Sequence, residues 1–197
     1  MQRLMRSALA ATLIAASTPA LASPWEIDPM HTGAQFAVKH LVISTVRGKL
    51  GKVTGAVNVD DTDLTKSSVQ ATIDAAGIDT GVAKRDEDLR GADFLDVAKF
   101  PTITFKSKKV EKVSDEKYRV TGDLTIRGVT KEVTLDVSGS PQPLKDPFGN
   151  TKLGGVATTL INRKDFGINW SQSLDGGGLV VGNEVDVTVD VELIKKP

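Results

Sequence analysis

The two histidines of the sequence, His31 and His40, are the first residues to consider for chemistry. Imidazole titrates near neutral pH and serves as a general base or as a metal ligand. A zinc site needs three or four ligands, so carboxylates such as Asp28 would have to complete one, and the spacing of the histidines matches no compact metal motif. We therefore expect no metal site and no catalytic histidine. Each histidine is expected either to hydrogen-bond locally at the mouth of a sheet or to make a polar contact with a ligand.

Arginines form a second group of candidates. Arg85 and Arg90 lie in a charged segment, where guanidinium groups can bind the oxygens of an anionic ligand. Acidic neighbours in the same segment, such as Asp86 and Asp88, allow the simpler interpretation that the charges pair with one another on a solvated helix. Arg127, at the end of a predicted strand, has the same two interpretations. We favour charge pairing within the segment.

Signatures of the common enzyme classes are absent from the sequence. It contains no H-E-x-x-H, G-x-S-x-G or G-x-G-x-x-G motif and no P-loop. The glycines at 176–178 are not followed by a helical pattern that would supply amide donors for a phosphate, so they indicate a hairpin tip. Without a cysteine the chain has no thiol chemistry. The sequence therefore predicts no catalytic residue, no metal and no cofactor.

The first residues have the pattern of a secretory signal peptide. Arg3 and Arg6 precede the short apolar run Leu9–Ala16, and Ala20-Leu21-Ala22 is a cleavage signal of the A-x-A type. We expect cleavage after Ala22, which leaves residues 23–197 as one domain. The 25 basic and 25 acidic residues of the whole chain balance, which indicates neither nucleic-acid binding nor a stable electrostatic membrane anchor.

Apolar and polar residues alternate in much of the remaining chain. Strict alternation places one face of a strand against a core and the other in solvent. The segments with this pattern are 35–38, 48–59, 69–74, 102–110, 118–127, 133–137, 156–161 and 185–193. Eight such strands are compatible with a two-sheet sandwich or with a closed antiparallel β-barrel, and an eight-stranded barrel can hold one small ligand.

One segment departs from the alternation. Residues 81–101 carry a charged helical pattern in which Arg85, Asp88 and Leu89 share one side of a short helix, and Pro101 ends the segment. We expect a short helical connection that covers one end of the sheet.

Short motifs over nearly the whole of the predicted domain resemble the YceI-like proteins. In chain order they are Trp25-Glu26-Ile27-Asp28 with His31, Phe36-x-Val38-x-His40, Arg47-Gly48, Asp79-Thr80, Arg85-Asp86-x-x-Leu89-Arg90, Asp93-Phe94-Leu95, Phe100-Pro101-x-Ile103-Thr104-Phe105, the run 122–131, Asp146-Pro147-Phe148-Gly149 and Asp165-Phe166-Gly167-Ile168. Each motif alone is modest, but together and in this order they are specific.

The resemblance implies an extended, lipocalin-like, eight-stranded antiparallel β-barrel in the bacterial periplasm, with an elongated apolar pocket for a polyisoprenoid or another long-chain amphipathic lipid. It is also compatible with a homodimer. Three positions depart from the family pattern. Thr32 stands where the family often has serine, Leu50 where it commonly has an aromatic residue, and Asp88 where it commonly has histidine. The last exchange bears on the preference for a head group.

The alternation assigns the residues that would line such a pocket. We expect the inward side chains to be Phe36, Val38, Val57, Ile73, Phe105, Leu124, Ile126, Leu135 and Ile168, with Phe94 and Leu95 capping the pocket from the helical connection. His31, His40 and Arg90 are the candidates for polar contacts.

We therefore expect non-catalytic binding, storage or transport of a long apolar lipid. The first alternative is an enzyme that acts on a lipid held in the same barrel. A structural or stress-associated protein without a ligand is the second.

Overall fold

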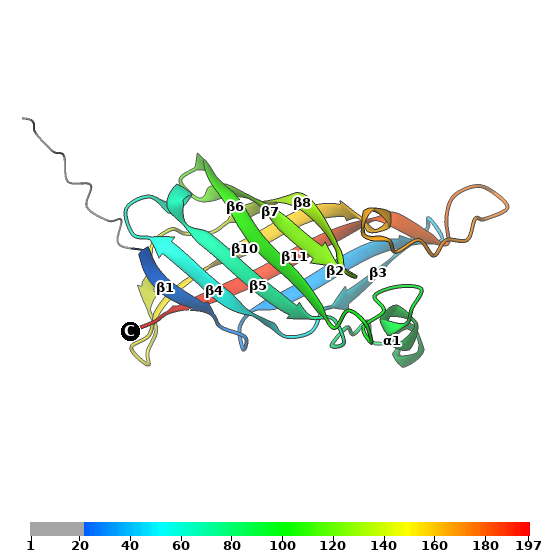
Figure 1. Ribbon diagram of the computed structural model, residues 1–197, viewed down its shortest axis with the longest axis horizontal. Helices are drawn as coiled ribbons and strands as arrows, with labels where there is room; N and C mark the ends of the chain where they lie inside the picture. The colour runs from blue at the N-terminus through cyan, green and yellow to red at the C-terminus, as the bar shows by residue number, and fades with distance from the viewer. Residues whose placement is uncertain (1–21) are drawn as a thin grey trace, which may run out of the picture.

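The computed structural model describes residues 22–197 (Figure 1). The predicted signal peptide lies outside the described residues except for Ala22, and its cleavage remains a prediction. The described elements are β1 (Ala22–Ile27), β2 (Gly33–His40), β3 (Ser44–Lys49), β4 (Val53–Asp60), η1 (Leu64–Lys66), β5 (Ser68–Asp74), α1 (Ala83–Arg90), β6 (Thr102–Ser114), β7 (Lys117–Ile126), β8 (Val129–Ser138), β9 (Leu144–Lys145), β10 (Thr151–Asn162), η2 (Arg163–Phe166) and β11 (Val181–Lys195).

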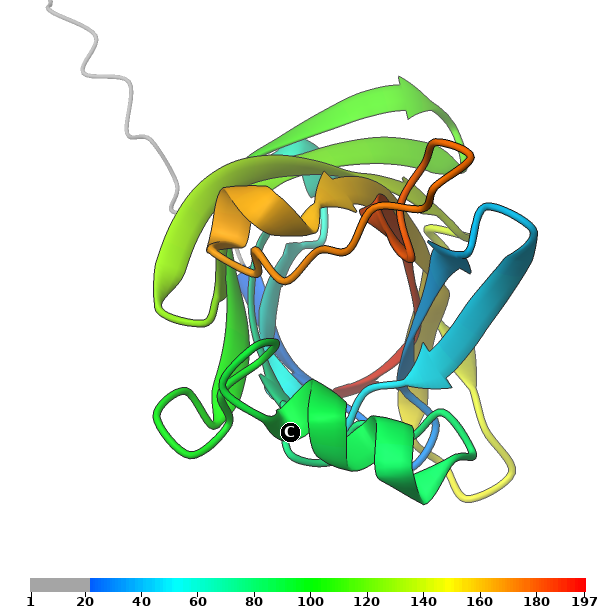
Figure 2. The same ribbon diagram turned by 90° about the vertical axis from the view of Figure 1, so that its right-hand side faces the viewer.

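Eight strands close into an antiparallel barrel. Their order around the barrel is β1, β4, β5, β6, β7, β8, β10 and β11, and β11 pairs again with β1. The longest pairing joins Lys152–Asn162 of β10 to Glu184–Ile194 of β11. Figure 2 shows the closed ring of strands end-on. The predicted barrel is confirmed, and the sandwich alternative is excluded.

The alternating sequence of β11 explains its place in the wall. Val185 and Val187 pack into one interior cluster and Val189 into another, whereas Asp186 and Asp190 are exposed to solvent. Because successive side chains of a strand point to opposite faces, the apolar residues fall on the inner face along the whole strand. The apolar side chains of β11 therefore form a row along much of the interior of the barrel.

The β2–β3 hairpin extends the barrel wall at one end. β2 pairs with Val185–Asp190 of β11, while β1 pairs with the later residues Leu193–Lys195. β1 and β2 thus pair with different stretches of β11. Figure 2 shows the β2–β3 hairpin and α1 around the same end of the barrel. This end is called the open end below.

Three described strands, β1, β3 and β9, were not among the predicted strands, and one predicted strand is interrupted. The alternation suggested a continuous strand over 48–59, but β3 ends at Lys49 and β4 begins at Val53. Gly51 lies between them, and a Cβ atom there would collide with the backbone carbonyl oxygen of Asp74. The chain can pass this close to β5 because glycine has no side chain.

The predicted helical connection is confirmed, and a tight hairpin joins β7 to β8. α1 lies within residues 81–101 and is followed by a series of turns. Between β7 and β8, Arg127 has φ = 50° and Gly128 has φ = 73°, which are left-handed values suited to a tight hairpin. None of the helices within 22–197 combines the length and the apolar character needed to cross a membrane.

The interior of the barrel contains two apolar clusters. The first core cluster consists of buried Ala75, Ile103, Ile126, Ile161, Phe166 and Ile168 with partly buried neighbours. The second core cluster consists of Ile27, Ala34 and Val53 with neighbours that include Val57 and Val189. Leu50 and Ile73 contact both clusters, so they lie where the clusters meet.

Candidate functional site

An apolar cavity of about 120 Å³ lies inside the barrel beside the first core cluster, and it is called the inner cavity here. Its walls come from β2, β6, β7, β10 and β11, from α1 and the turns after it, and from η2. The lining residues are Phe36, Val38, Leu50, Ile78, Leu89, Phe94, Leu95, Ile103, Ile126, Ile161, Arg163, Phe166, Ile168, Val181, Val185 and Val187. Arg163 is the one polar residue among them. Such a lining favours an apolar occupant.

A larger and more polar space, of about 800 Å³, adjoins the inner cavity at the open end and is called the outer chamber. The two spaces share the lining residues Phe36, Val38, Leu89, Phe94 and Val181. The other residues of the outer chamber are Lys39, His40, Val46, Lys84, Arg85, Glu87, Asp88, Gly91, Ala92, Asp93, Trp170 and Val180. An amphipathic molecule would find an apolar interior and a polar exit in this order.

Lys84 and Arg85, the two cations of α1 that line the outer chamber, already form hydrogen bonds within the protein. The Nζ of Lys84 lies 3.3 Å from Glu87 Oε2 and 3.2 Å from Asp88 Oδ1, and these hydrogen bonds raise the pKa of Lys84. Arg85 donates from Nε to Thr80 Oγ1 at 2.7 Å and from Nη2 to the Thr80 carbonyl oxygen at 3.0 Å. Charge pairing within the segment is therefore seen for Lys84, whereas Arg85 bonds Thr80 rather than a carboxylate, which corrects the favoured interpretation for this arginine.

Buried Asp86 fixes the start of α1. Its carboxylate accepts hydrogen bonds from the backbone nitrogen of Thr80 at 2.8 Å and from Thr80 Oγ1 at 2.5 Å. These bonds keep the pKa of Asp86 below its ordinary value. Because Arg85 bonds the same threonine, Thr80 connects two successive helical side chains to the loop between β5 and α1. This arrangement positions α1 beside the outer chamber.

Arg163 is a buried residue that the sequence analysis did not identify. Its guanidinium donates to the carbonyl oxygens of Gly182, Ile168, Trp170 and Val181 at 2.6–3.1 Å and to Asn183 Oδ1 at 3.2 Å. Burial lowers its pKa. All five N–H groups of an arginine are thereby used. Arg163 holds the segment after η2 against the start of β11, and this segment forms one side of the outer chamber.

Six of the predicted pocket residues line the inner cavity: Phe36, Val38, Phe94, Leu95, Ile126 and Ile168. Ile73 and Leu124 pack against the first core cluster, and Val57 packs against the second. Phe105 lies opposite Leu124 and Leu135 lies opposite Val120, so both share the inner face of the wall without lining the cavity.

The predicted polar contacts lie in three different places. His40 lines the outer chamber at the end of β2. Arg90 lines neither space. Its guanidinium donates to the carbonyl oxygens of Ala76 and Ile78 at 2.7 and 2.6 Å and thereby ties α1 to the loop after β5. His31 lies in the turn before β2, at the strand end opposite to His40. The two histidines therefore do not act as a pair.

His31 belongs to a cluster of charges outside the two spaces. Its Nδ1 lies 2.8 Å from Asp28 Oδ2, and Asp28, His31 and Glu192 present potential metal ligands within 4.8 Å of one another. The ammonium of Lys152 lies 3.0 Å from both Asp28 Oδ2 and Glu192 Oε2. It supplies the positive charge that a bound cation would otherwise bring. The cluster forms an ion-pair network centred on Lys152.

The hydrogen bonds of this network act strongly on Asp28, which is almost fully buried. The bond with His31 is the largest cause, and bonds from the backbone of Met30 and from Lys152 add to it, so that the pKa of Asp28 falls to about 2. The network joins the β1–β2 turn to β10 and β11. It stabilises that side of the barrel.

Residues 25–193 match the family model of the YceI-like domain. The UPF0312 protein SA2479 of Staphylococcus aureus (strain N315) is 34% identical over 165 residues, which are 84% of this chain and 94% of that protein. The crystal structure of Campylobacter jejuni YCEI protein has 30% identity and a TM-score of 0.68, covering 81% of this chain and 90% of that one. A polyisoprenoid binding domain from Saccharophagus degradans has 14% identity and a TM-score of 0.62, covering 87% of this chain and 98% of that domain.

Proposed function

Because this chain belongs to the YceI-like family, we propose that it binds a polyisoprenoid or another long-chain amphipathic lipid, without catalysis, for storage or transport in the periplasm. The apolar tail occupies the inner cavity and the head group lies in the outer chamber. The main observation behind this proposal is that an apolar cavity adjoins a polar chamber at one end of a closed barrel. The Saccharophagus domain, described as polyisoprenoid-binding, shares the fold and supports the choice of ligand class.

The tail dominates the affinity in this account. Each buried methylene contributes about 0.8 kcal/mol, so one five-carbon isoprene unit contributes about 3 kcal/mol before ordering costs. A neutral hydrogen bond contributes only about 0.5–1.5 kcal/mol net. A few isoprene units therefore outweigh any single polar contact. The outer chamber orients the lipid and selects its head group.

The size of the inner cavity limits how the tail is held. Its 120 Å³ is comparable to the cavity of about 150 Å³ that accommodates benzene in another protein. A long tail must therefore either extend through the outer chamber or displace wall side chains such as Phe94 and Leu95. Both residues lie on turns after α1 rather than on barrel strands, so these turns are the part of the wall that yields.

The charges beside α1 in the outer chamber favour an uncharged head group on that side, while Lys39, unpaired within residues 22–197, lines the chamber from β2. Glu87, Asp88 and Asp93 line it, and Lys84 is already paired with the first two. A phosphate entering beside α1 would face these carboxylates. A hydroxyl or carbonyl group could hydrogen-bond there without repulsion. We therefore expect a prenyl alcohol or a comparable neutral lipid to bind more tightly than its phosphate ester.

The surroundings of His40 support binding rather than turnover. Within residues 22–197 its imidazole forms no hydrogen bond with a carboxylate, whereas a general base is normally oriented by a further group. If the alternative of an enzyme were correct, His40→Ala would abolish the conversion of a bound lipid. If the protein only binds the lipid, His40→Ala should still take it up, and neither this variant nor the wild type should change the lipid chemically.

Tryptophan fluorescence tests the proposed function. Trp170 lines the outer chamber, whereas Trp25 is buried at 1% exposure elsewhere in the barrel. In a Trp25→Phe variant, titration with a long prenyl alcohol should produce a saturable change in the emission of Trp170. The prenyl phosphate should bind more weakly. Emission that stays unchanged, together with retention of the lipid in the unbound fraction, would contradict the proposal.

A further inference from the structure

The tip of the β2–β3 hairpin exposes apolar side chains beside the outer chamber. Ile43 is 86% exposed and Val42 is 61% exposed. The backbone nitrogen of the adjacent Leu41 donates to the carbonyl oxygen of Val180, a residue that lines the outer chamber. The exposed tip therefore lies directly beside the exit of the cavity.

The conformation of this tip opposes local preference. Leu41 has φ = 52° and Val42 has φ = 66°, in the left-handed region where glycine and asparagine are usual. For a β-branched residue such as valine this is a true outlier, and such strained residues concentrate at functional positions. A solvent-exposed turn with no further role would be expected to carry polar turn residues.

The hairpin also carries positive charge and has no acidic residue of its own. Over residues 33–49 the charged side chains are Lys39, Arg47 and Lys49, and the segment has no Asp or Glu. Within the described part of the chain, none of these three cations forms an ion pair. Exposed aliphatic side chains flanked by unpaired cations suit the surface of an anionic bilayer.

We propose that the hairpin tip formed by Leu41, Val42 and Ile43 docks the open end of the barrel transiently onto an anionic phospholipid bilayer. This inference rests on the proposed function, because docking places the cavity exit where a long-chain lipid would leave or enter the membrane. Val42 and Ile43 insert among the lipids at the interface. Lys39 and Arg47, which lie nearer to the tip than Lys49, contact the anionic head groups.

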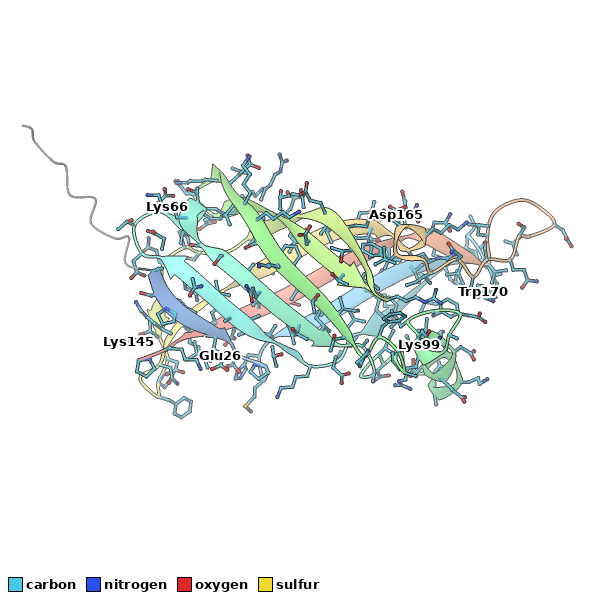
Figure 3. All side chains as sticks on the ribbon, viewed as in Figure 1. Glu26, Lys66, Lys99, Lys145, Asp165 and Trp170 are labelled. Atoms are coloured by element: carbon cyan, nitrogen blue, oxygen red, sulfur yellow. The ribbon has the colours of Figure 1, made fainter. Side chains whose placement is uncertain are left out.

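The opposite end of the barrel supplies a matched control. Phe148, in the loop after β9, is 90% exposed and as apolar as Ile43. Figure 3 shows Lys145 of β9 at the end of the molecule away from Trp170, which lies beside the outer chamber. A general effect of removing surface apolar groups would appear equally at both positions. If the open end is the docking surface, vesicle binding should fall only when Ile43 is substituted.

Cosedimentation of the mature chain with vesicles tests the docking itself. We expect the wild type to bind vesicles of phosphatidylcholine and phosphatidylglycerol, and to bind less in high salt or with phosphatidylcholine alone. Ile43→Asp should weaken binding by about tenfold or more, since it removes the apolar group and adds a repelled charge. Ile43→Leu and Phe148→Asp should bind as the wild type does.

Extraction of a prenyl alcohol from the same vesicles tests the purpose of docking. Ile43→Asp should extract it several-fold more slowly, yet bind it with unchanged affinity when it is supplied from a solvent stock. Equal cosedimentation and extraction by Ile43→Asp and the wild type would overturn the inference, as would an equal loss in Phe148→Asp. If no form binds the prenyl alcohol from solution, the proposed function fails, while selective vesicle binding by the hairpin would still support the docking surface.

Discussion

Phe94 and Trp170 lie against each other, with ring centroids 5.6 Å apart and ring planes inclined by 34°. Phe94 belongs to the turns after α1, and Trp170 belongs to the segment after η2. Both line the outer chamber, and Phe94 also lines the inner cavity. The contact therefore joins two segments that are distant in the sequence at the boundary between the two spaces.

Removing the contact between Phe94 and Trp170 should destabilise the boundary between the inner cavity and the outer chamber. Phe94→Ala should lower the free energy of unfolding by about 1–3 kcal/mol, because it loses the aromatic pair and part of a buried side chain. It should also weaken prenyl-alcohol binding, while Phe94→Leu should retain most of the affinity through its apolar bulk. Urea unfolding and fluorescence titration measure the two effects. Identical behaviour of Phe94→Ala and the wild type would contradict the assignment.

Arg163 should be among the residues most sensitive to substitution. Arg163→Met leaves buried carbonyl oxygens without donors, and we expect a loss of about 3 kcal/mol or more in the free energy of unfolding. Arg163→Lys should restore little of it, because an ammonium cannot reproduce the five donors of the planar guanidinium. Denaturant titration of both variants provides the measurement. A loss below about 1 kcal/mol in Arg163→Met would show that the hydrogen bonds contribute little.

Asp28 should make the stability depend on pH in the acid range. Its pKa is lowered from 3.8 to about 2 in the folded protein, chiefly by the hydrogen bond with His31. A lowered folded-state value means that the stabilisation is complete above 3.8 and is lost as the pH falls through about 2. The contribution is on the order of 2 kcal/mol.

The difference in unfolding free energy between the wild type and Asp28→Asn isolates this contribution from other titrating groups. We expect the difference to shrink as the pH is lowered from about 5 to about 2. His31→Ala should move the loss to higher pH, because it removes the principal cause of the lowered pKa. A difference that stays constant across this range would exclude the predicted titration of Asp28.

Leu50 should influence the length of the apolar tail that is accepted. It lines the inner cavity and contacts both core clusters, so it separates the cavity from the interior beyond it. Leu50→Ala should cost about 2–5 kcal/mol of stability and shift preference toward longer prenyl alcohols. Leu50→Phe should shift it toward shorter ones. Competition between prenyl alcohols of different lengths gives the readout, and unchanged selectivity in both variants would reject this role.

Much of the barrel could be predicted because apolar and polar residues alternate along most of its strands. Apolar residues stand at alternate positions over 185–193 of β11 and, except for Gly122, over 118–126 of β7. This parity alone placed Ile126 on the inner face. β9 was missed because it has only two residues, and β1 and β3 were missed because neither alternates over its whole length. β3, for example, reads Ser-Thr-Val-Arg-Gly-Lys, and its strand structure depends on pairing with β2.

The candidate site was less predictable where segments without periodicity contribute to it. Ile78 and Leu89 line the inner cavity from a loop and from α1, and alternation cannot assign such residues. Arg163 was not identified, since no local pattern shows that carbonyl oxygens from distant residues surround it. His31 and His40 lie close in the sequence, but β2 separates them by its whole length.

Native mass spectrometry of a matched pair of variants tests the central claim most directly. Val187 lines the inner cavity, while its neighbour Asp186 is exposed on the opposite face of β11. Val187→Phe fills the cavity, and Asp186→Phe adds the same ring outside the barrel. The account predicts that the wild type and Asp186→Phe retain one long-chain prenyl alcohol each, whereas folded Val187→Phe retains little or none. Equal retention by all three proteins would show that the lipid does not occupy the inner cavity.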